Sequence, residues 1–228
     1  MTEETPRKAV GADGRRTVRG VTLGNAEPAD YSAADVAPVE DAAEDDLVAQ
    51  LRAEAAPTRR RAILELARRD PEPTTVDRLA TLALEDSDDQ VRQFAVEALG
   101  KVSGDPTVAV EVLETDEDPW VRAEAVVTLD RLARAEYEST FVDLLSADAE
   151  AVRRNALIAL VKLRGEGAKD ELLGAVDDPS DRVREWAVKL LGQYEDDPLV
   201  TDTLEAVVDA EDETGVVKET AARALGAR

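Results

Sequence analysis

The stretch Val91-Arg92-Gln93-Phe94-Ala95-Val96-Glu97-Ala98-Leu99-Gly100 decides the fold, because variants of it recur along the chain. The pattern Val-Arg-x-x-Ala-x-x-Ala-Leu-Gly returns with substitutions from Val121, Val152, Val183 and Val217, at intervals of 30, 31, 31 and 34 residues. A worn copy starts near Thr58. Self-similarity at a fixed period of this length is typical of a solenoid, in which each unit buries its apolar face against its neighbours.

Each copy reads as the second helix of a helix-turn-helix pair. The segment before the first clear copy places Val76, Leu79, Ala80 and Ala83 on one helical face. By the same pattern, the expected first helices start near 46 and cover 74–84, 106–114, 137–146, 167–176 and 199–209. The expected second helices cover 58–69, 90–102, 120–133, 151–163, 182–193 and 216–227. We therefore predict an all-α, right-handed α-solenoid of about six helix pairs over residues 45–228.

The turns carry residues that begin and end helices. Asp118-Pro119 and Asp178-Pro179 each place a capping carboxylate before a proline, whose missing N–H costs nothing in the first helical turn. The glycines Gly100, Gly192 and Gly226 follow the last apolar residue of a copy, as the C-terminal end of a helix prefers.

Residues 1–44 lack this helical pattern and form a separate N-terminal arm. Its first two dozen residues are net basic through Arg7, Lys8, Arg15, Arg16 and Arg19, and the stretch from 26 to 44 is acidic. Composition favours a flexible, solubilising tail. A second reading is an extended arm that lies along the acidic solenoid or docks to a partner, with Val21, Leu23 and Tyr31 as apolar anchors.

Composition excludes several functional classes. The 228 residues include 51 acidic and 28 basic ones, for a formal net charge of -23, and the acid is spread along the whole chain. The chain has no Cys and no His, which removes disulfides, thiolate chemistry and the commonest metal ligand and general base. Nucleic acid is an unexpected partner, because its phosphates are bound by clustered Lys and Arg.

Targeting signals are weak in this sequence. Arg15-Arg16 raises the question of a twin-arginine export signal, but only Val21-Thr22-Leu23 follows before Glu27, too short for the apolar region that such a signal needs. No stretch approaches the roughly 20 apolar residues of a membrane span. We expect a cytoplasmic protein that does not enter the membrane and is a monomer by itself.

The full motif Asp-x-Asp-x-x-Val-Arg-x-x-Ala-x-x-Ala-Leu-Gly resembles the short HEAT-like repeat first associated with phycobilisome lyases. Its best copy consists of Asp86, Asp88, Val91, Arg92, Ala95, Ala98, Leu99 and Gly100. The resemblance covers residues 45–228 and implies the solenoid fold, but it is weakly specific for function. Dense surface carboxylate with few Lys further resembles the acidic, halophilic proteins of salt-loving archaea, which stay hydrated at molar salt.

A repeated basic residue forms a ladder along the copies: Arg92, Arg122, Arg153, Arg184 and, conservatively, Lys218. A phosphate-binding ladder is one interpretation. The resemblance to HEAT-like repeats instead implies a structural ladder, in which each Arg reaches a loop Asp of its own or an adjacent unit. Each of these arginines follows loop acids such as Asp86 and Asp116, so we expect the structural role.

The second helices also carry the candidate binding residues. Counting the motif Val as position zero, positions 0, 4, 5 and 8 are apolar, so positions 3 and 6 are expected to be exposed on the concave side. These positions hold Phe94, Val127, Ile158 and Trp186, with Glu97, Glu124, Asn155 and Lys189 beside them. Either the apolar groups fill gaps between repeats, or they line a groove for a helix or an extended peptide. Basic residues at Lys101, Arg131, Arg154 and Lys162 would rim this groove, and Trp120 would extend it.

These observations favour a non-enzymatic scaffold or adaptor that binds another protein on its concave face. The sequence offers no catalytic residues, no cofactor motif and no metal site; residues 209–215 are acidic, but their Gly is misplaced for a calcium loop and Thr220 stands where the bidentate acid belongs. Two alternatives come from the resemblance: a bilin lyase or isomerase subunit, and a HEAT-like DNA-binding or DNA-repair protein. The negative charge argues against the second alternative.

Overall fold

The computed structural model describes residues 17–18, 21–22, 42–194 and 196–226, and over them the chain forms six consecutive pairs of α-helices. The first helices are α1 (Glu44–Gln50), α3 (Pro73–Glu85), α5 (Thr107–Thr115), α7 (Glu138–Asp143), α9 (Lys169–Ala175) and α11 (Pro198–Asp209). The second helices are α2 (Ala56–Leu66), α4 (Asp89–Val102), α6 (Pro119–Ala133), α8 (Glu150–Arg164), α10 (Asp181–Leu191) and α12 (Gly215–Gly226). Two 3-10 turns, η1 (Leu144–Ser146) and η2 (Gly165–Ala168), follow α7 and precede α9.

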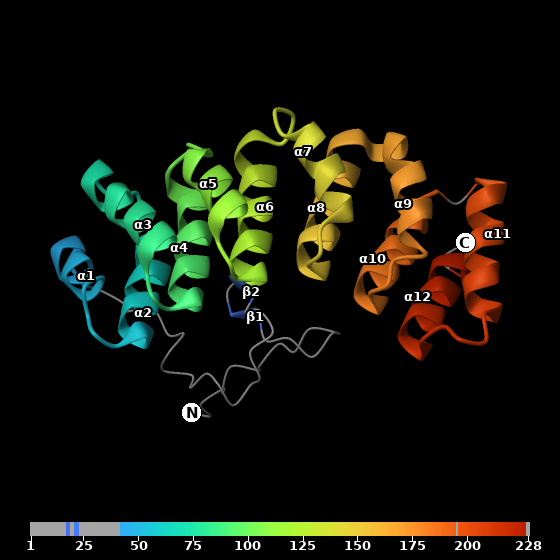
Figure 1. Ribbon diagram of the computed structural model, residues 1–228, viewed down its shortest axis with the longest axis horizontal. Helices are drawn as coiled ribbons and strands as arrows, with labels where there is room; N and C mark the ends of the chain where they lie inside the picture. Colours follow the sequence, from blue (N-terminus) through green and yellow to red (C-terminus); the bar gives the residue numbers. More distant parts are fainter. Residues whose placement is uncertain (1–16, 19–20, 23–41, 195, 227–228) are drawn as a thin grey trace, which may run out of the picture.

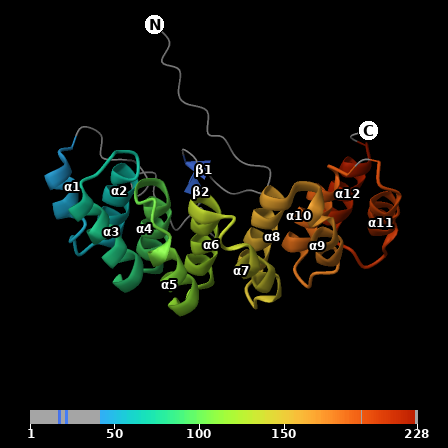
Figure 2. The same ribbon diagram turned by 90° about the horizontal axis from the view of Figure 1, so that it is seen from above.

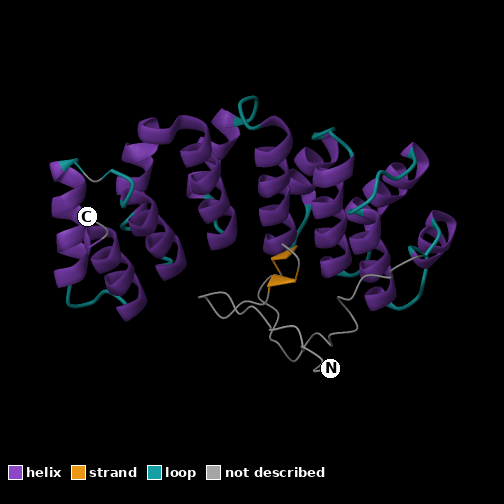
Figure 3. Cartoon of the chain, turned by 180° about the vertical axis from the view of Figure 1, so that it is seen from behind, coloured by secondary structure: helices purple, strands orange, loops and turns teal. Residues whose placement is uncertain are grey.

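The pairs stack in chain order into an arched rod. Figure 1 shows this succession from α1 to α12. In Figure 2 the first helices form the outer, convex layer, and the second helices form the inner, concave layer. Figure 3 shows from behind that short loops join the helices throughout. The all-α solenoid of six pairs predicted from the repeat is therefore confirmed.

Acidic side chains cap two of the second helices, and the sequence predicts the cap at Asp118. At the start of α4, a carboxylate oxygen of Asp88 accepts a hydrogen bond from the backbone N–H of Val91 at 2.9 Å. Asp118 likewise accepts from the N–H of Val121 at 3.0 Å at the start of α6, where Pro119 occupies the first turn. These bonds satisfy amide groups that have no partner inside the helix.

The predicted cap at Asp178-Pro179 is wrong. The helix α10 begins later, at Asp181, with Ser180 at the N-cap position. Asp178 instead accepts a hydrogen bond from the backbone N–H of Ser180 at 2.8 Å, which closes a turn within the loop. Asp178 lies two residues before the N-cap, in the loop, and its carboxylate takes part in the contact between repeats described below.

Gly100 does not end its helix either, since α4 continues to Val102. A Cβ atom at Gly100 would lie only 3.0 Å from the Thr128 hydroxyl oxygen of α6. That hydroxyl donates a hydrogen bond to the Val96 carbonyl oxygen at 3.2 Å. Glycine stands here because α4 and α6 approach closely, and not because the backbone must turn.

Small aliphatic side chains form the core, as the composition predicts. The motif residues Val91, Ala95 and Leu99 are all buried, and their equivalents in later repeats are buried with them, except for Leu225 in the last repeat, which is half-buried. Buried side chains form two clusters, one running from α1 into α8 and the other from α8 to α12. The core is therefore a layer that extends along the rod between its two rows of helices.

A short β-hairpin is the part of the N-terminal arm that the structure describes. Its strands β1 (Thr17–Val18) and β2 (Val21–Thr22) pair antiparallel, with Val18 opposite Val21. In Figures 1 and 2 the hairpin lies beside α6, on the concave side. Of the predicted apolar anchors, Val21 belongs to β2, and Leu23 and Tyr31 lie outside the described residues. No helix in the described ranges could cross a bilayer.

Candidate functional site

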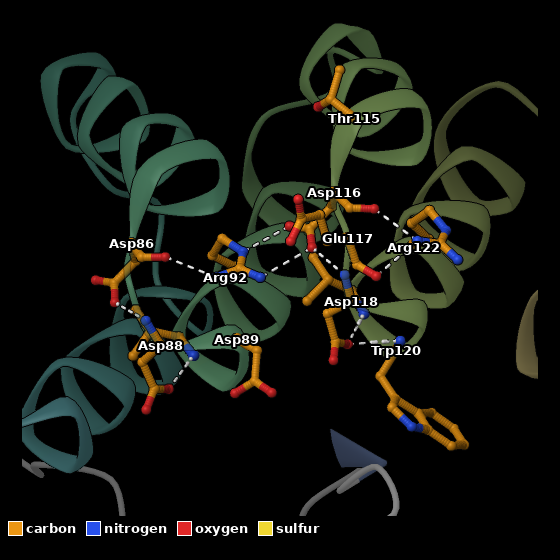
Figure 4. A network of polar contacts seen from close by, with 12 residues as sticks. Asp86, Asp88, Asp89, Arg92, Thr115, Asp116, Glu117, Asp118, Trp120 and Arg122 are labelled. Carbon is orange, nitrogen blue, oxygen red and sulfur yellow. Dashed lines mark hydrogen bonds and ion pairs between the residues drawn. The ribbon is translucent and has the colours of Figure 1, made fainter.

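Arginine side chains join successive repeats along one edge of the rod. Each guanidinium binds both oxygens of a carboxylate in the loop of the next pair: Arg59 with Asp86 (2.8 and 2.6 Å), Arg92 with Asp116 (2.7 and 3.0 Å), Arg153 with Asp178 (2.8 and 2.8 Å) and Arg184 with Glu213 (2.7 and 2.8 Å). Figure 4 shows the contact between Arg92 and Asp116. Bidentate, charge-assisted hydrogen bonds of this kind fix geometry as well as contributing energy.

Each of these arginines also holds the loop of its own repeat. The Nη1 atom of Arg92 donates to the backbone carbonyl oxygen of Asp86 at 2.9 Å, while the far carboxylate of Asp116 also accepts from the backbone N–H of Asp118 at 2.8 Å. The hydrogen bond to Asp116 raises the pKa of Arg92 above its ordinary value. One side chain thus sets two loops relative to each other, which is a structural role.

The ladder is interrupted at Arg122. This guanidinium donates to the backbone carbonyl oxygens of Asp116 and Glu117, at 2.8 and 3.0 Å, but within the described ranges it meets no carboxylate of the following repeat. The reason lies five residues before Val152, where Ala147 occupies the place of Asp86, Asp116 and Asp178. The alanine at position 147 is the signal in the sequence that distinguishes this repeat from the others.

The two ends of the ladder also differ from those predicted from the sequence. Arg59 of the worn copy makes a full contact with Asp86, although the predicted ladder started at Arg92. Its spacing of 33 residues from Arg92 was the available signal. At the other end Lys218 lies in α12, and no further repeat follows it in the described residues, so it has no next loop to bind there.

The concave face is built differently from the expectation, because motif position 3 points toward the preceding second helix. Asn155 at this position of α8 donates a hydrogen bond from Nδ2 to the Ala123 carbonyl oxygen of α6 at 2.9 Å. Glu124 at the same position of α6 is hydrogen-bonded to the side chain of Gln93 on α4. Position 3 therefore lines the seam between second helices.

This seam explains a correction at Phe94. We expected its ring on the concave surface, but the side chain is only 5% exposed and belongs to the hydrophobic core. Phe94 occupies motif position 3 of α4, and α4 packs against α2 on that side. A large apolar side chain is buried in such a seam, whereas the polar groups of Glu124 and Asn155 bridge it.

The other predicted apolar binding residues lie on the second helices and are more exposed than Phe94. Val127 on α6, Ile158 on α8 and Trp186 on α10 are half-buried. The ammonium group of Lys189 lies 4.3 Å from the centre of the Trp186 ring, a cation–π contact. These residues place one apolar group on each of three consecutive second helices.

Two further predicted residues lie near this row. Trp120 is half-buried at the start of α6. Arg154 is only 9% exposed and donates to the Asn155 side-chain oxygen at 3.3 Å, so it packs into the seam more than it rims a groove. The basic rim expected beside it is partly neutralised within the chain. Lys101 pairs with Glu97 at 2.6 Å and Lys162 pairs with Asp130 at 2.5 Å.

Two neighbouring carboxyl groups lie between α4 and α6. Burial is the main cause that raises the pKa of Glu124 to about 8, and the nearby charge of Glu97 raises it further. The hydrogen bond from Gln93 and the more distant charges of Lys101 and Arg131 act in the opposite direction. Glu124 is therefore mostly protonated at pH 7. The sequence placed both acids beside the candidate groove but could not indicate this protonation.

A separate hollow of about 730 Å³ lies in the outer layer, between α9 and α11. Its lining combines apolar side chains such as Leu173 and Leu199 with the acidic residues Asp177 and Asp212. Leu199 is 56% exposed there. The ladder residues Arg184 and Glu213 also line this hollow, and its mixed lining indicates no particular ligand.

Comparisons with known proteins agree with this architecture. A family model described as HEAT repeats matches three overlapping segments, residues 44–114, 107–192 and 163–226. No curated protein matches the chain.

Solved structures that are similar to this chain have low sequence identity to it. The Escherichia coli protein YibA is 19% identical, with a TM-score of 0.62 over 81% of this chain and 70% of that one. An engineered protein is 20% identical, with a TM-score of 0.50 over 81% and 98% of the two chains. The complex of CpcE and CpcF of phycocyanin lyase from Nostoc is 17% identical, with a TM-score of 0.42 over 82% and 90%. At these identities the likeness concerns the fold alone.

Proposed function

Because this chain belongs to the HEAT repeat family, we propose that it is a non-enzymatic scaffold or adaptor that holds a partner protein on its concave face. The observation that supports this proposal is the row formed by Val127, Ile158 and Trp186 on consecutive second helices. Solenoids present extended concave surfaces of this kind to their partners. An aromatic ring with a cation over it, as at Trp186 and Lys189, suits the centre of an interface.

Composition supports a binding role over the two alternatives. The full chain contains neither Cys nor His, so a lyase subunit built on it would lack a thiolate nucleophile and an imidazole base. DNA binding needs a basic concave surface, whereas the formal net charge of this chain is -23 and its concave lysines are partly paired with acids. No feature of the described residues favours either alternative.

Site-specific photo-crosslinking in the native cell extract tests the proposal. A photoreactive amino acid replaces Ile158 on the concave layer, and the matched control replaces Val142, an exposed apolar residue of α7 in the outer layer. We expect a discrete crosslinked polypeptide from position 158 and none from position 142. Equal labelling at both positions, or no crosslink at 158, would contradict a concave binding surface.

A second substitution separates binding from folding. Trp186→Ala should weaken the crosslink at position 158, because it removes the aromatic group next to that position in the row, and should move the melting temperature by only about 2–4 °C. If the crosslink disappears only when the helical melting transition collapses, Trp186 is part of the core and not of a binding surface.

A further inference from the structure

Basic side chains form a row on the concave face. The exposed stripe of a second helix includes motif positions 6 and 10, which are one turn apart, because the opposite side of the helix packs against the first helices. Position 10 is basic and exposed in four consecutive repeats, at Arg68, Lys101, Arg131 and Lys162. This basic row therefore follows the inner layer of helices seen in Figure 2.

The composition of this stripe contrasts with that of the chain. Lys189 and Arg223 occupy position 6 of α10 and α12, so positions 6 and 10 of the described second helices hold six basic residues and one acid, Glu97. The full chain has 51 acidic and 28 basic residues, the opposite balance. The helix dipole favours a cation in the last turn, but it does not select the concave side of that turn.

The ion pairs beneath the basic row do not neutralise it. Two buried carboxylates are each shared by two cations, Asp130 by Lys162 and Arg134, and Glu65 by Arg68 and Arg69. Each of these clusters therefore keeps one positive charge in excess, and the side chains of Lys162 and Arg68 remain 49% and 45% exposed. Arg131, in the middle of the row, is exposed and makes no ion pair within the described ranges.

The spacing of the row matches an extended chain. Adjacent packed helices lie about 10 Å apart, so the four cations at position 10 span roughly 30 Å. An extended chain of the polyproline type rises about 3.1 Å per residue, and every third side chain returns to the same side after about 9 Å. A segment with a carboxylate at every third residue can therefore meet one cation in each repeat.

Apolar side chains lie beside the basic row. Val127 and Ile158, at position 6, precede Arg131 and Lys162 by one turn, about 6 Å along the same helices. The residues between the carboxylates of an extended segment can pack on them. The stripe has one partly exposed aromatic group, Trp186, and not the succession of rings on which single-stranded nucleic acid stacks. These features favour a polypeptide over a nucleic acid.

We propose that the concave face binds an acidic, extended segment of a partner protein, whose carboxylates meet the basic row from Arg68 to Lys162 and whose intervening side chains pack on Val127 and Ile158. This inference rests on the proposed scaffold function and adds the chemical class of the partner. At an ionic strength of about 0.15 M the Debye length is about 8 Å, so the acids of the outer layer are largely screened from the row. The local cations then select acidic segments against basic ones.

Fluorescence anisotropy of a labelled peptide tests the proposal with the full-length chain. The probe consists of four Asp-Pro-Val units, in which an acid recurs at every third residue and proline favours the extended conformation. The matched peptide carries Asn in place of Asp. We expect saturable binding of the acidic probe at about 0.15 M KCl, and binding that is about ten-fold weaker both for the Asn peptide and for the acidic probe at about 1 M KCl.

Charge reversal at Arg131 locates the site. Arg131→Glu should weaken binding of the acidic probe about ten-fold, because it places a like charge in the middle of the row, whereas Arg131→Lys should stay within about two-fold of the parent. The matched control is Arg78→Glu on α3, in the outer layer, which changes the net charge equally and should change the affinity by less than about two-fold. Thermal unfolding of each variant checks that the fold is intact.

Three results would overturn the proposal: equal losses for Arg131→Glu and Arg78→Glu, equal binding of the Asp and Asn peptides, or tighter binding of a short oligothymidine strand than of the acidic probe. Crosslinking at position 158 separates this inference from the scaffold function. In the Arg131→Glu background the crosslink to the partner should decrease. A crosslink that stays at the parent yield would contradict an acidic partner segment and leave the scaffold function standing.

Discussion

A single loop position decides whether a contact of the arginine ladder forms. The residue five positions before the motif Val is Asp86 for α4 and Asp116 for α6, and each binds the arginine of the preceding repeat. For α8 the residue is Ala147. Its backbone angles, φ -63° and ψ 149°, match those of Asp116, φ -72° and ψ 134°. The loop therefore has the right shape for a contact and lacks only the carboxylate.

We expect Ala147→Asp to complete the ladder. The new carboxylate can meet Arg122, which currently binds only backbone carbonyls of its own loop. A partly exposed ion pair with bidentate geometry should stabilise the fold by about 1 kcal/mol. The corresponding rise in melting temperature is about 2–4 °C for a chain of this size.

Two controls test this assignment by thermal unfolding. Ala147→Asn can make the same turn hydrogen bonds as Asp but brings no charge, so it should raise the melting temperature less. In an Arg122→Gln background Ala147→Asp should give almost no gain, because its partner is gone. An equal gain with and without Arg122 would mean that the new side chain acts within its own loop.

Glu124 predicts a pH dependence of stability at the scale of one side chain. Its pKa in the folded protein is raised from 4.5 to about 8 by burial and by the charge of Glu97. A carboxyl with a raised pKa in the folded state leaves stability intact below the unfolded value and lowers it as pH rises through about 4.5 to 8. Glu124→Gln mimics the protonated group, so it should raise the melting temperature at pH 8.5 and change it little at pH 4.5.

The parent and the variant differ only at residue 124, so the difference between their melting temperatures reports the effect of that position. Glu111→Gln, at an exposed position of α5, is the matched control and should give no difference that depends on pH. A constant offset for Glu124→Gln from pH 4.5 to 8.5 would show that Glu124 ionises normally in the folded protein.

At the scale of the helix, the sequence predicted the features that recur in every repeat. It missed the contacts between neighbouring helices. The buried positions of Val91, Ala95 and Leu99 followed from periodicity, and the cap at Asp118 followed from local chemistry. The burial of Phe94 did not follow, because periodicity gives the angle around a helix and not the neighbour that covers it. The hairpin was missed because strands of two residues carry no periodic signal.

The two aromatic residues at motif position 3 should therefore respond differently to truncation. Phe94→Ala leaves a cavity in the core beside α2 and should lower the free energy of unfolding by about 3–5 kcal/mol. Trp186→Ala removes a half-buried ring at a surface contact with Lys189 and should cost about 1 kcal/mol. Denaturant unfolding of both variants measures the two values, and similar costs would place Trp186 in the core as well.

For the candidate site, the sequence indicated the helices that carry its residues but not the contacts that those residues make. Val127, Ile158 and Trp186 lie on the second helices and are half-buried. The pairing of Lys101 with Glu97 and the protonation of Glu124 depend on which second helices stand side by side. Such contacts between repeats are absent from the sequence of a single repeat.

The whole molecule is an array in which each repeat meets only its neighbours. The two clusters of buried residues meet at α8. The missing ladder contact lies between the repeat that contains α6 and the repeat that contains α8. Stability in such arrays is close to a sum of repeat and interface contributions. The centre of the rod therefore combines its weakest ladder joint with the part of the concave face where the hairpin lies.

The charge of the whole chain predicts how this array responds to salt. A formal net charge of -23 on an elongated body without a large central core repels itself, and this repulsion opposes stacking of the repeats. Because the Debye length falls from about 10 Å at 0.1 M to about 3 Å at 1 M salt, added KCl should weaken the repulsion between repeats. We expect the melting temperature to rise by on the order of 10 °C over this range.

Sucrose is the control, because it acts by exclusion from the surface and not by screening, and it should give a smaller rise in melting temperature. The rise in KCl should shrink in a variant whose surface acids are changed to amides, whereas the rise in sucrose should stay the same. A melting temperature that falls with KCl would mean that the ion pairs of the arginine ladder, which salt also screens, outweigh the repulsion among the other acids.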